Sequence, residues 1–208
     1  MVDTSLYAAF LIAAFALCVT PGPDMMFIVA VGGRGGPLTG MAAAVGVACA
    51  MLVHTVAAAL GLSALFLTLP TLYEALHWAG AAYLLFLAVR AFRGADGPVE
   101  AGTAPGNGRR RAFWRGAVTN LLNPKVILFN VSFLPQFVNP ALGHVREQFL
   151  VLGCTITLMG VIVDGSVGAL SGKLASLLRR SRRIARGLDY FSGTVFAGLA
   201  VRLLAAPK

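Results

Sequence analysis

The chain has 208 residues, of which 58% are hydrophobic and only 12% carry a charge. Soluble domains carry about 25% charged residues, so this composition, with a mean hydropathy of +0.80, excludes an ordinary soluble domain and predicts a polytopic membrane protein. The net charge of +9 raises the alternative of a nucleic-acid-binding protein. We expect no nucleic-acid partner, because the arginines gather in short segments between apolar runs and no aromatic side chains alternate with them to form a stacking platform.

Six apolar segments are long enough to cross a membrane as helices, since a helical span needs about 20 residues. In chain order they cover 5–31, 41–67, 74–92, 114–137, 148–170 and 188–205. They fill nearly the whole chain, so we interpret 1–208 as a single all-α transmembrane domain in contact with the lipid bilayer. The first segment is not interpreted as a signal peptide, because no positive region precedes it and it continues past two prolines to Val31.

The first and fourth segments are each interrupted near the middle by proline next to a charge. The first break reads Thr20-Pro21-Gly22-Pro23-Asp24, and the second reads Asn120-Leu121-Leu122-Asn123-Pro124-Lys125. Proline removes a backbone donor, and such breaks are tolerated at membrane depth only where they line a cavity or are enclosed by protein. Interrupted spans at matching positions of two halves indicate the binding site of a transporter.

The two halves of the chain are similar, which predicts an internal repeat. Pro23-Asp24 aligns with Pro124-Lys125, and Trp78-Ala79-Gly80 in the third segment aligns with Phe191-Ser192-Gly193 in the sixth. Three spans per half is an odd number, so six transmembrane helices would form two inverted three-helix repeats. The predicted repeats cover about 5–92 and 114–205, with a basic cytoplasmic linker at 93–113. Coincidence among helices rich in Leu, Ala and Gly is the alternative.

Positive residues gather after the first, third and fifth segments, which predicts the orientation of the chain. The segments after the second and fourth spans contain a single Lys or Arg, which is Arg146. The segment after the first span contains Arg34, the one after the third contains Arg90, Arg93, Arg109–Arg111 and Arg115, and the one after the fifth contains Lys173, Arg179, Arg180, Arg182, Arg183 and Arg186. Cytoplasmic loops carry the excess of Lys and Arg, so we expect these three segments in the cytoplasm and both termini outside.

Asp24, Lys125 and Asp164 are ionisable residues well inside apolar segments. A charge at the bilayer centre costs roughly 2.5–3.5 kcal/mol on insertion scales, so such residues face the bundle interior, a partner or water, and mark functional sites. For Asp24 and Lys125 the alternative is a structural ion pair between the broken helices. Helix starts after the prolines offer N–H groups to a carboxylate, and the preceding helix ends offer carbonyls to a cation, which is compatible with an amino acid zwitterion.

Other polar residues in these segments admit two interpretations. Thr20 and Asn123 could cap the broken helices or contact a substrate, and Asn120 shares the fourth segment with Lys125. His54 could relay protons or be an ordinary hydrogen-bonded interior group. Asp164 could carry a coupling proton or pair at the end of its span. Asp24, His54 and Asp164 are therefore the candidates for proton coupling.

The sequence indicates no metal, no cofactor and no enzymatic activity. Its three cysteines, Cys18, Cys49 and Cys154, lie apart in apolar segments without a CxxC pair, and we find no metal-ligand spacing, ATP-binding motif or nucleophile elbow. Small residues at helical spacing, such as Gly36 with Gly40 and Ala42 with Gly46, allow close helix approach within a protomer or in a homodimer.

Several motifs together resemble those of the LysE/RhtB amino-acid exporters. Thr20-Pro21-Gly22-Pro23 is similar to the family's TPGP motif, and Phe113 to Phe137 is similar to its fourth span. Gly46 to His54 with Ala59–Ala64 resembles its second span, and Trp78 to Leu84 its third. The resemblance covers about 5–205. It implies a multi-pass protein of the bacterial inner membrane that exports amino acids or close derivatives, driven by the proton-motive force, with substrate-site candidates Thr20, Pro21, Gly22, Pro23, Asn123, Pro124 and Lys125.

Two positions depart from the pattern that this resemblance implies. Asp24 stands where the family often has asparagine, and Met51 stands where its second span often has an acid. We therefore hypothesise a proton antiporter in which Asp24 binds the substrate amine or a proton and Lys125 binds the carboxylate. The alternatives are an exporter of another small solute or a cation, and a membrane scaffold that transports nothing. A membrane enzyme or redox carrier is a further alternative, which would require reactive cysteines, a metal cluster or a catalytic His/Asp set.

Overall fold

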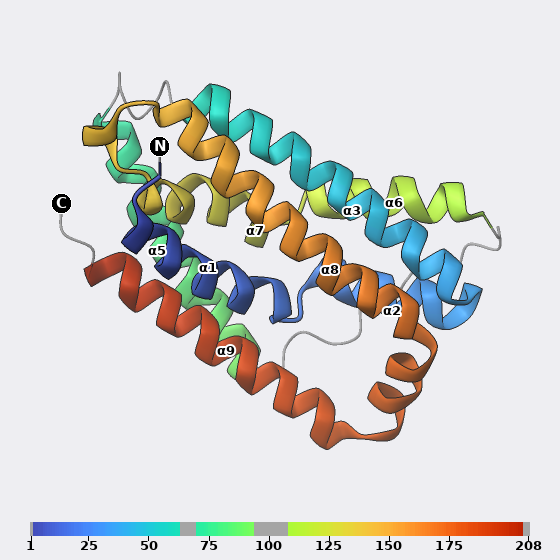
Figure 1. Cartoon of the computed structure of the whole chain (residues 1–208). Helices are drawn as coiled ribbons and strands as arrows, with labels where there is room; N and C mark the ends of the chain where they lie inside the picture. Colours follow the sequence, from blue (N-terminus) through green and yellow to red (C-terminus); the bar gives the residue numbers. More distant parts are fainter. Residues whose placement is uncertain (1, 63–69, 94–107, 206–208) are drawn as a thin grey trace.

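The computed structural model of the chain describes residues 2–62, 70–93 and 108–205, and every regular element in them is helical. Figure 1 shows the arrangement of these helices. The elements are α1 (Thr4–Val19), α2 (Pro23–Gly35), α3 (Pro37–Ala57), the π-helical turn η1 (Ala58–Leu62), α5 (Pro70–Phe92), α6 (Arg109–Leu121), α7 (Pro124–Leu128), the π-helical turn η2 (Phe129–Phe133), the 3₁₀ turns η3 (Leu134–Phe137) and η4 (Pro140–Leu142), α8 (Val145–Arg180) and α9 (Arg182–Ala205). The all-α prediction is confirmed.

Both predicted helix breaks are present, and they bend the chain by similar angles. The α1–α2 pair bends by 43°, and the pair formed by α6 and the helical turns over Pro124–Phe137 bends by 46°. Pro23 and Pro124 each occupy the first turn of the helix that follows, where a missing N–H costs nothing.

The length and composition of the helices support a multi-pass membrane protein. Pro37–Gly61 and Val145–Leu177 are each long and apolar enough to cross a membrane, and the two bent pairs bring the number to four if each is one span. The apolar helix Trp78–Phe92 is shorter. The arrangement of six spans in two inverted repeats therefore stays a prediction.

Two predicted connections are helical instead. Residues 32–40 connect the first two predicted spans, but α2 continues through Gly35, and the chain turns at Gly36, at φ 85°. A glycine in a helix costs about 1 kcal/mol, which close packing against α8 offsets here, since a Cβ on Gly32 would collide with Ser171. The basic segment 173–186 is helical except at Ser181, because arginine and lysine are good helix formers.

Two apolar clusters build the interior. One joins α2, α3 and α6 through residues such as Phe27, Ile28 and Val47. The larger one joins α1, the α7–η3 segment, the first half of α8, and α9, and its largest fully buried side chains are Phe10, Phe129, Phe133, Phe137 and Phe149. Figure 1 shows α8 crossing the molecule beside α3, with α5 alongside α9.

A polar network closes the end of the bundle where α1 begins and η4 lies. Asp3 caps α1 by accepting hydrogen bonds from Ser5 and Leu6, and it also accepts one from Asn139 at 3.1 Å. These bonds, above all that from the Ser5 hydroxyl, lower the pKa of Asp3 to about 2, so this carboxylate is ionised at neutral pH. The fully buried Gln148 donates to the carbonyls of Asn139 and Gly143, which fixes the loop before α8.

Candidate functional site

The end of α1 exposes backbone carbonyls that Lys125 satisfies. Pro21 lacks the N–H that would bond to the Leu17 carbonyl in an unbroken helix. The Lys125 ammonium, at the start of α7, donates to this carbonyl at 3.0 Å and to the Thr20 carbonyl at 2.8 Å. The freed carbonyls, which the sequence analysis offered to a cation such as a substrate ammonium, are therefore bound by a residue of the second broken helix.

Asp24, in the first turn of α2, accepts hydrogen bonds from side chains at the end of α6. Its Oδ2 accepts a hydrogen bond from the Asn120 side-chain amide at 2.9 Å and another from the Asn123 amide at 2.7 Å. The charged residue after each break therefore bonds to the break of the other helix. Among the described residues, Asp24 and Lys125 bond to these groups and not directly to each other, so the direct ion pair considered above is not formed.

Asn123 and Thr20, for which capping and substrate contact were both open, each act as caps. Asn123 accepts a hydrogen bond from the Lys125 backbone N–H at 3.0 Å through Oδ1 while its amide holds Asp24. The Thr20 hydroxyl donates to the Ala16 carbonyl at 2.6 Å, and the residue also lines the cavity described below. Both side chains are almost fully buried.

Three hydrogen-bonding positions at the site remain open. Within the described part of the chain, Asp24 Oδ1 and Asn120 Oδ1 are buried and accept no hydrogen bond. A lysine ammonium has three N–H donors, and Lys125 uses two on carbonyls. A buried polar atom without a partner costs about 1–3 kcal/mol, so the site favours a ligand that brings N–H donors to the two oxygens and an acceptor to Lys125.

A cavity of about 50 Å³ lies where the two broken helices meet α3 and α8. It has room for about four water molecules, at roughly 10–15 Å³ each. Its wall is formed by Leu17, Cys18, Thr20, Gly22, Asp24, Met25, Val47, Met51, Asn120, Lys125, Val126, Ile156, Gly160 and Asp164. The structure thus brings Asp164, from a distant segment, to the same cavity as Asp24 and Lys125.

Of the remaining predicted residues, one lines the cavity and the others lie outside its wall. Gly22 lines it, and a Cβ added there would lie 3.3 Å from the Lys125 ammonium nitrogen. Pro21, Pro23 and Pro124 interrupt the helices but do not belong to the lining. His54 also stands outside the lining, with its Nε2 3.4 Å from the Asn120 carbonyl oxygen, a long contact.

Sequence reasoning missed several wall residues from α1, α3 and α8. Cys18, interpreted above only as an apolar residue, lies in the wall together with Met51 and Gly160. A signal for Gly160 was available, because it precedes Asp164 by one helical turn and therefore shares its face of α8. No pattern in the sequence marked Cys18.

A family model described as "LysE type translocator" matches residues 15–206. The chain belongs to this family. The resemblance drawn from the proline motifs is confirmed, and the family is one of translocators.

Relatives of this LysE-family chain include named efflux proteins. An uncharacterized membrane protein of Pseudomonas aeruginosa is 34% identical over 191 residues, which cover 89% of this chain and 88% of the relative. A homoserine/homoserine lactone efflux protein of Salmonella typhimurium is 29% identical over 199 residues, 95% of each chain. A leucine efflux protein of Enterobacter sp. is 29% identical over 197 residues, 93% of this chain and 92% of the relative. No solved structure matches the chain.

Proposed function

We propose that this protein is a secondary exporter that moves amino acids or close derivatives out of the cytoplasm in exchange for protons. The observation that carries the proposal is the reciprocal bonding of two broken helices around one small cavity, with two oxygens and one N–H left open. The names of the relatives, a homoserine or homoserine lactone exporter and a leucine exporter, favour an amino acid as the substrate.

The open groups suit the two ends of an amino acid zwitterion. The substrate ammonium would donate to Asp24 Oδ1 and Asn120 Oδ1, while the substrate carboxylate would accept the remaining N–H of Lys125. Both charged residues are held in place by their other bonds, so little side-chain entropy is lost on binding. A small metal cation alone is the weaker candidate, because it would leave that N–H unused and be repelled by Lys125.

The charges in the cavity support coupling to protons. Asp24 and Asp164 contribute two negative charges and Lys125 one positive charge, so the fully ionised cavity carries a net charge of −1 in a low-dielectric environment. A proton on Asp164 would neutralise the cavity without disturbing the bonds of Asp24. We therefore assign the coupling proton to Asp164, and leave His54, outside the lining, as the second candidate.

Alternating access would follow from an inverted repeat of six spans. A pseudo-twofold axis would exchange α1–α2 with α6–α7, α3 with α8 and α5 with α9. In support of this, the bends of 43° and 46° are nearly equal, and the packing of α3 on α6 has its counterpart in the packing of α8 on α1. We propose that one repeat rocks against the other around the cavity, with the cytoplasmic side at the basic end.

The test is flux of radiolabelled leucine and homoserine in proteoliposomes with an imposed pH gradient. We expect the gradient to drive transport and an ionophore that dissipates it to abolish the effect. Asp24→Asn should lower flux at least tenfold, because it removes the negative charge and replaces the unpaired oxygen with an NH₂ donor that cannot accept the substrate ammonium. Lys125→Ala should have an effect of the same size, because it removes the two hydrogen bonds that join α7 to the end of α1. Lys173→Ala, which changes an exposed lysine far along α8, is the matched control and should transport normally.

Three results would contradict the proposal in different parts. Absence of flux for any amino acid by the folded wild-type protein would contradict export and favour a scaffold. Flux that ignores the pH gradient would contradict proton coupling. Normal flux in Asp24→Asn or Lys125→Ala would contradict the assignment of the site.

A further inference from the structure

One face of α8 presents three residues to the cavity at intervals of one helical turn. They are Ile156, Gly160 and Asp164, and they all belong to the cavity wall. Gly160, the middle residue, contributes no side chain, so the cavity reaches the helix backbone there. A Cβ built on Gly160 would meet no heavy atom within 4 Å, apart from its chain neighbours and the nearby helix backbone.

Close helix packing does not explain the glycine at this position. Other glycines of α8 do serve packing, since a Cβ on Gly153 would collide with the Thr55 side chain and a Cβ on Gly168 with the Gly40 backbone. Gly160 has no such neighbour, and a glycine in a helix costs about 1 kcal/mol relative to alanine. The absent side chain therefore leaves space inside the cavity rather than space for another helix.

The wall around this space is largely apolar. Val47 and Met51 of α3 and Val126 of α7 line the same cavity, and Ile156 lies one turn away from Gly160 on α8. Met51 is 8% exposed and Ile156 1% exposed, so both side chains are held within the protein. Asp24, Asn120 and Lys125 supply the polar groups from the broken helices.

We propose that the space over Gly160 is the side-chain subsite of the exporter, and that Gly160 and Met51 limit the size of the side chain that it accepts. This inference rests on the proposed function, in which Asp24, Asn120 and Lys125 hold the ammonium and carboxylate ends. The substrate class is then the amino acids with uncharged, apolar side chains up to about the size of leucine, which exceeds the cavity of about 50 Å³ in this conformation and is admitted as the two repeats move apart. Asp164, at the edge of the subsite, holds the coupling proton and not a cationic side chain.

The first experiment narrows the subsite and measures KM and kcat for alanine and leucine in proteoliposomes. One extra methylene in an apolar pocket changes discrimination by about 10–200-fold. Gly160→Ala should therefore lower the leucine-to-alanine ratio of kcat/KM by about tenfold or more, mainly through the KM for leucine, and Gly160→Val should abolish leucine flux. Gly172→Ala is the matched control, because Gly172 also lies in α8 with open space at its Cβ, but on the surface and outside the cavity wall.

The second experiment widens the subsite, so that a positive result cannot come from misfolding. Met51→Ala should raise phenylalanine flux relative to leucine flux by about tenfold, because the larger side chain gains the space that the methionine occupied. An unchanged leucine-to-alanine ratio in Gly160→Ala, or an equal loss of both substrates, would overturn the inference. A wild-type preference for lysine over leucine that disappears in Asp164→Asn would also overturn it, since a cationic side chain would then occupy the subsite.

The proposed function and the subsite assignment can be disproved separately. If the wild-type protein transports no amino acid, the proposed function falls and the subsite falls with it. If it transports amino acids but Gly160→Ala and Met51→Ala leave the selectivity unchanged, only the subsite assignment is wrong.

Discussion

Two backbone carbonyls and two asparagine amides fix the charged residues of the site. Because Pro21 has no N–H, the Leu17 carbonyl lacks the hydrogen-bond donor that a continuous helix would provide. The Lys125 ammonium donates to this carbonyl instead, at 3.0 Å. Asp24 in turn holds both asparagine amides of the α6 end. Because each anchor belongs to the other broken helix, a change in the angle between the helices must move the charges, which would couple binding to conformational change in the proposed transport cycle.

Asn123 caps the start of α7 and also donates a hydrogen bond to Asp24, and substitution can separate these two roles. Serine is about as good a helix N-cap as asparagine, whereas alanine at such a position costs about 1 kcal/mol. We expect Asn123→Ser to keep the melting temperature close to that of the wild type but to lose most transport, because the shorter hydroxyl does not reach Asp24. Asn123→Ala should lower both the melting temperature, measured by thermal unfolding in detergent, and the rate of transport, measured as flux.

The control for this pair is Asn139→Ala, which removes a cap in η4 far from the cavity and should leave flux unchanged. Full transport in Asn123→Ser would mean that the amide contact with Asp24 is dispensable.

The sequence predicted the polar part of the site better than its apolar part. Asp24, Asn120 and Lys125 stood out because charge and amide groups are costly in an apolar segment, and all three line the cavity. Cys18, Met51 and Gly160 resemble the ordinary residues of a membrane helix, so their role depends on which helices pack together. For Cys18 that information lies only in the tertiary contacts, whereas the helical spacing of Gly160 from Asp164 was a signal that the sequence offered.

At the scale of elements, α3 and α6 approach so closely that their backbones touch. A Cβ on Gly46 would collide with the Phe113 carbonyl, and a Cβ on Gly116 would collide with the Ala43 carbonyl. Such small-residue contacts take the place of the hydrophobic effect in joining helices within lipid. The spacing of Gly46 indicated a close contact in the sequence, but not its partner.

We expect Gly116→Ala to destabilise the protein by about 1–3 kcal/mol, because a backbone carbonyl cannot move aside as a flexible side chain can. Gly198→Ala in α9, where a Cβ meets no atom within 4 Å, should be neutral or slightly stabilising through its helix propensity. Thermal unfolding in detergent measures both. Equal melting temperatures for the two variants would show that α3 and α6 are less tightly packed than described.

Element boundaries were harder to predict than element positions. The apolar segments located the helices, but turn signals at Gly32–Gly36 and charges at 173–186 were interpreted as connections, and both segments are mostly helical. In each case packing or helix propensity outweighed the local signal. The predicted linker at 93–113 falls largely outside the described residues, which resume at Gly108 with α6 directly after it.

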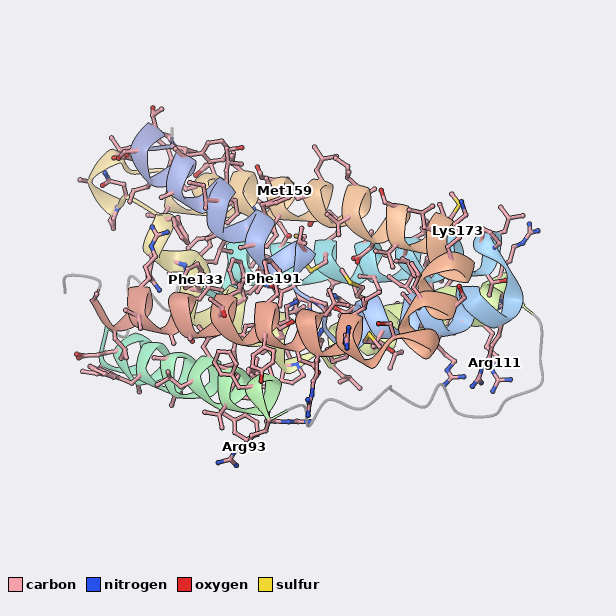
Figure 2. The ribbon with its side chains drawn as sticks, turned by 90° about the horizontal axis from the view of Figure 1, so that it is seen from below. Arg93, Arg111, Phe133, Met159, Lys173 and Phe191 are labelled. Carbon is pink, nitrogen blue, oxygen red and sulfur yellow. The ribbon has the colours of Figure 1, made fainter. Side chains whose placement is uncertain are left out.

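At the scale of the whole molecule, some of the basic residues gather at one end of the bundle. Figure 2 shows Arg111 and Lys173 at one end, and in Figure 1 the first residues of α1 and the last of α9 lie at the opposite end, beside η4. Arg93, which follows α5, lies apart from Arg111 and Lys173 in Figure 2, so the charge asymmetry that the loops predict stays a prediction for the folded molecule. If positive residues face the cytoplasm, α1 begins and α9 ends outside the cell.

Cysteine labelling in intact cells tests this orientation. In a background with Cys18, Cys49 and Cys154 replaced by alanine, Ala141→Cys places a thiol in η4, and Arg109→Cys places one at the start of α6. Both positions are exposed, so differences in labelling report the side of the membrane rather than burial. A membrane-impermeant maleimide should label Ala141→Cys in intact cells but Arg109→Cys only after permeabilisation, and the reverse pattern would place the basic end outside and contradict the direction of export proposed here.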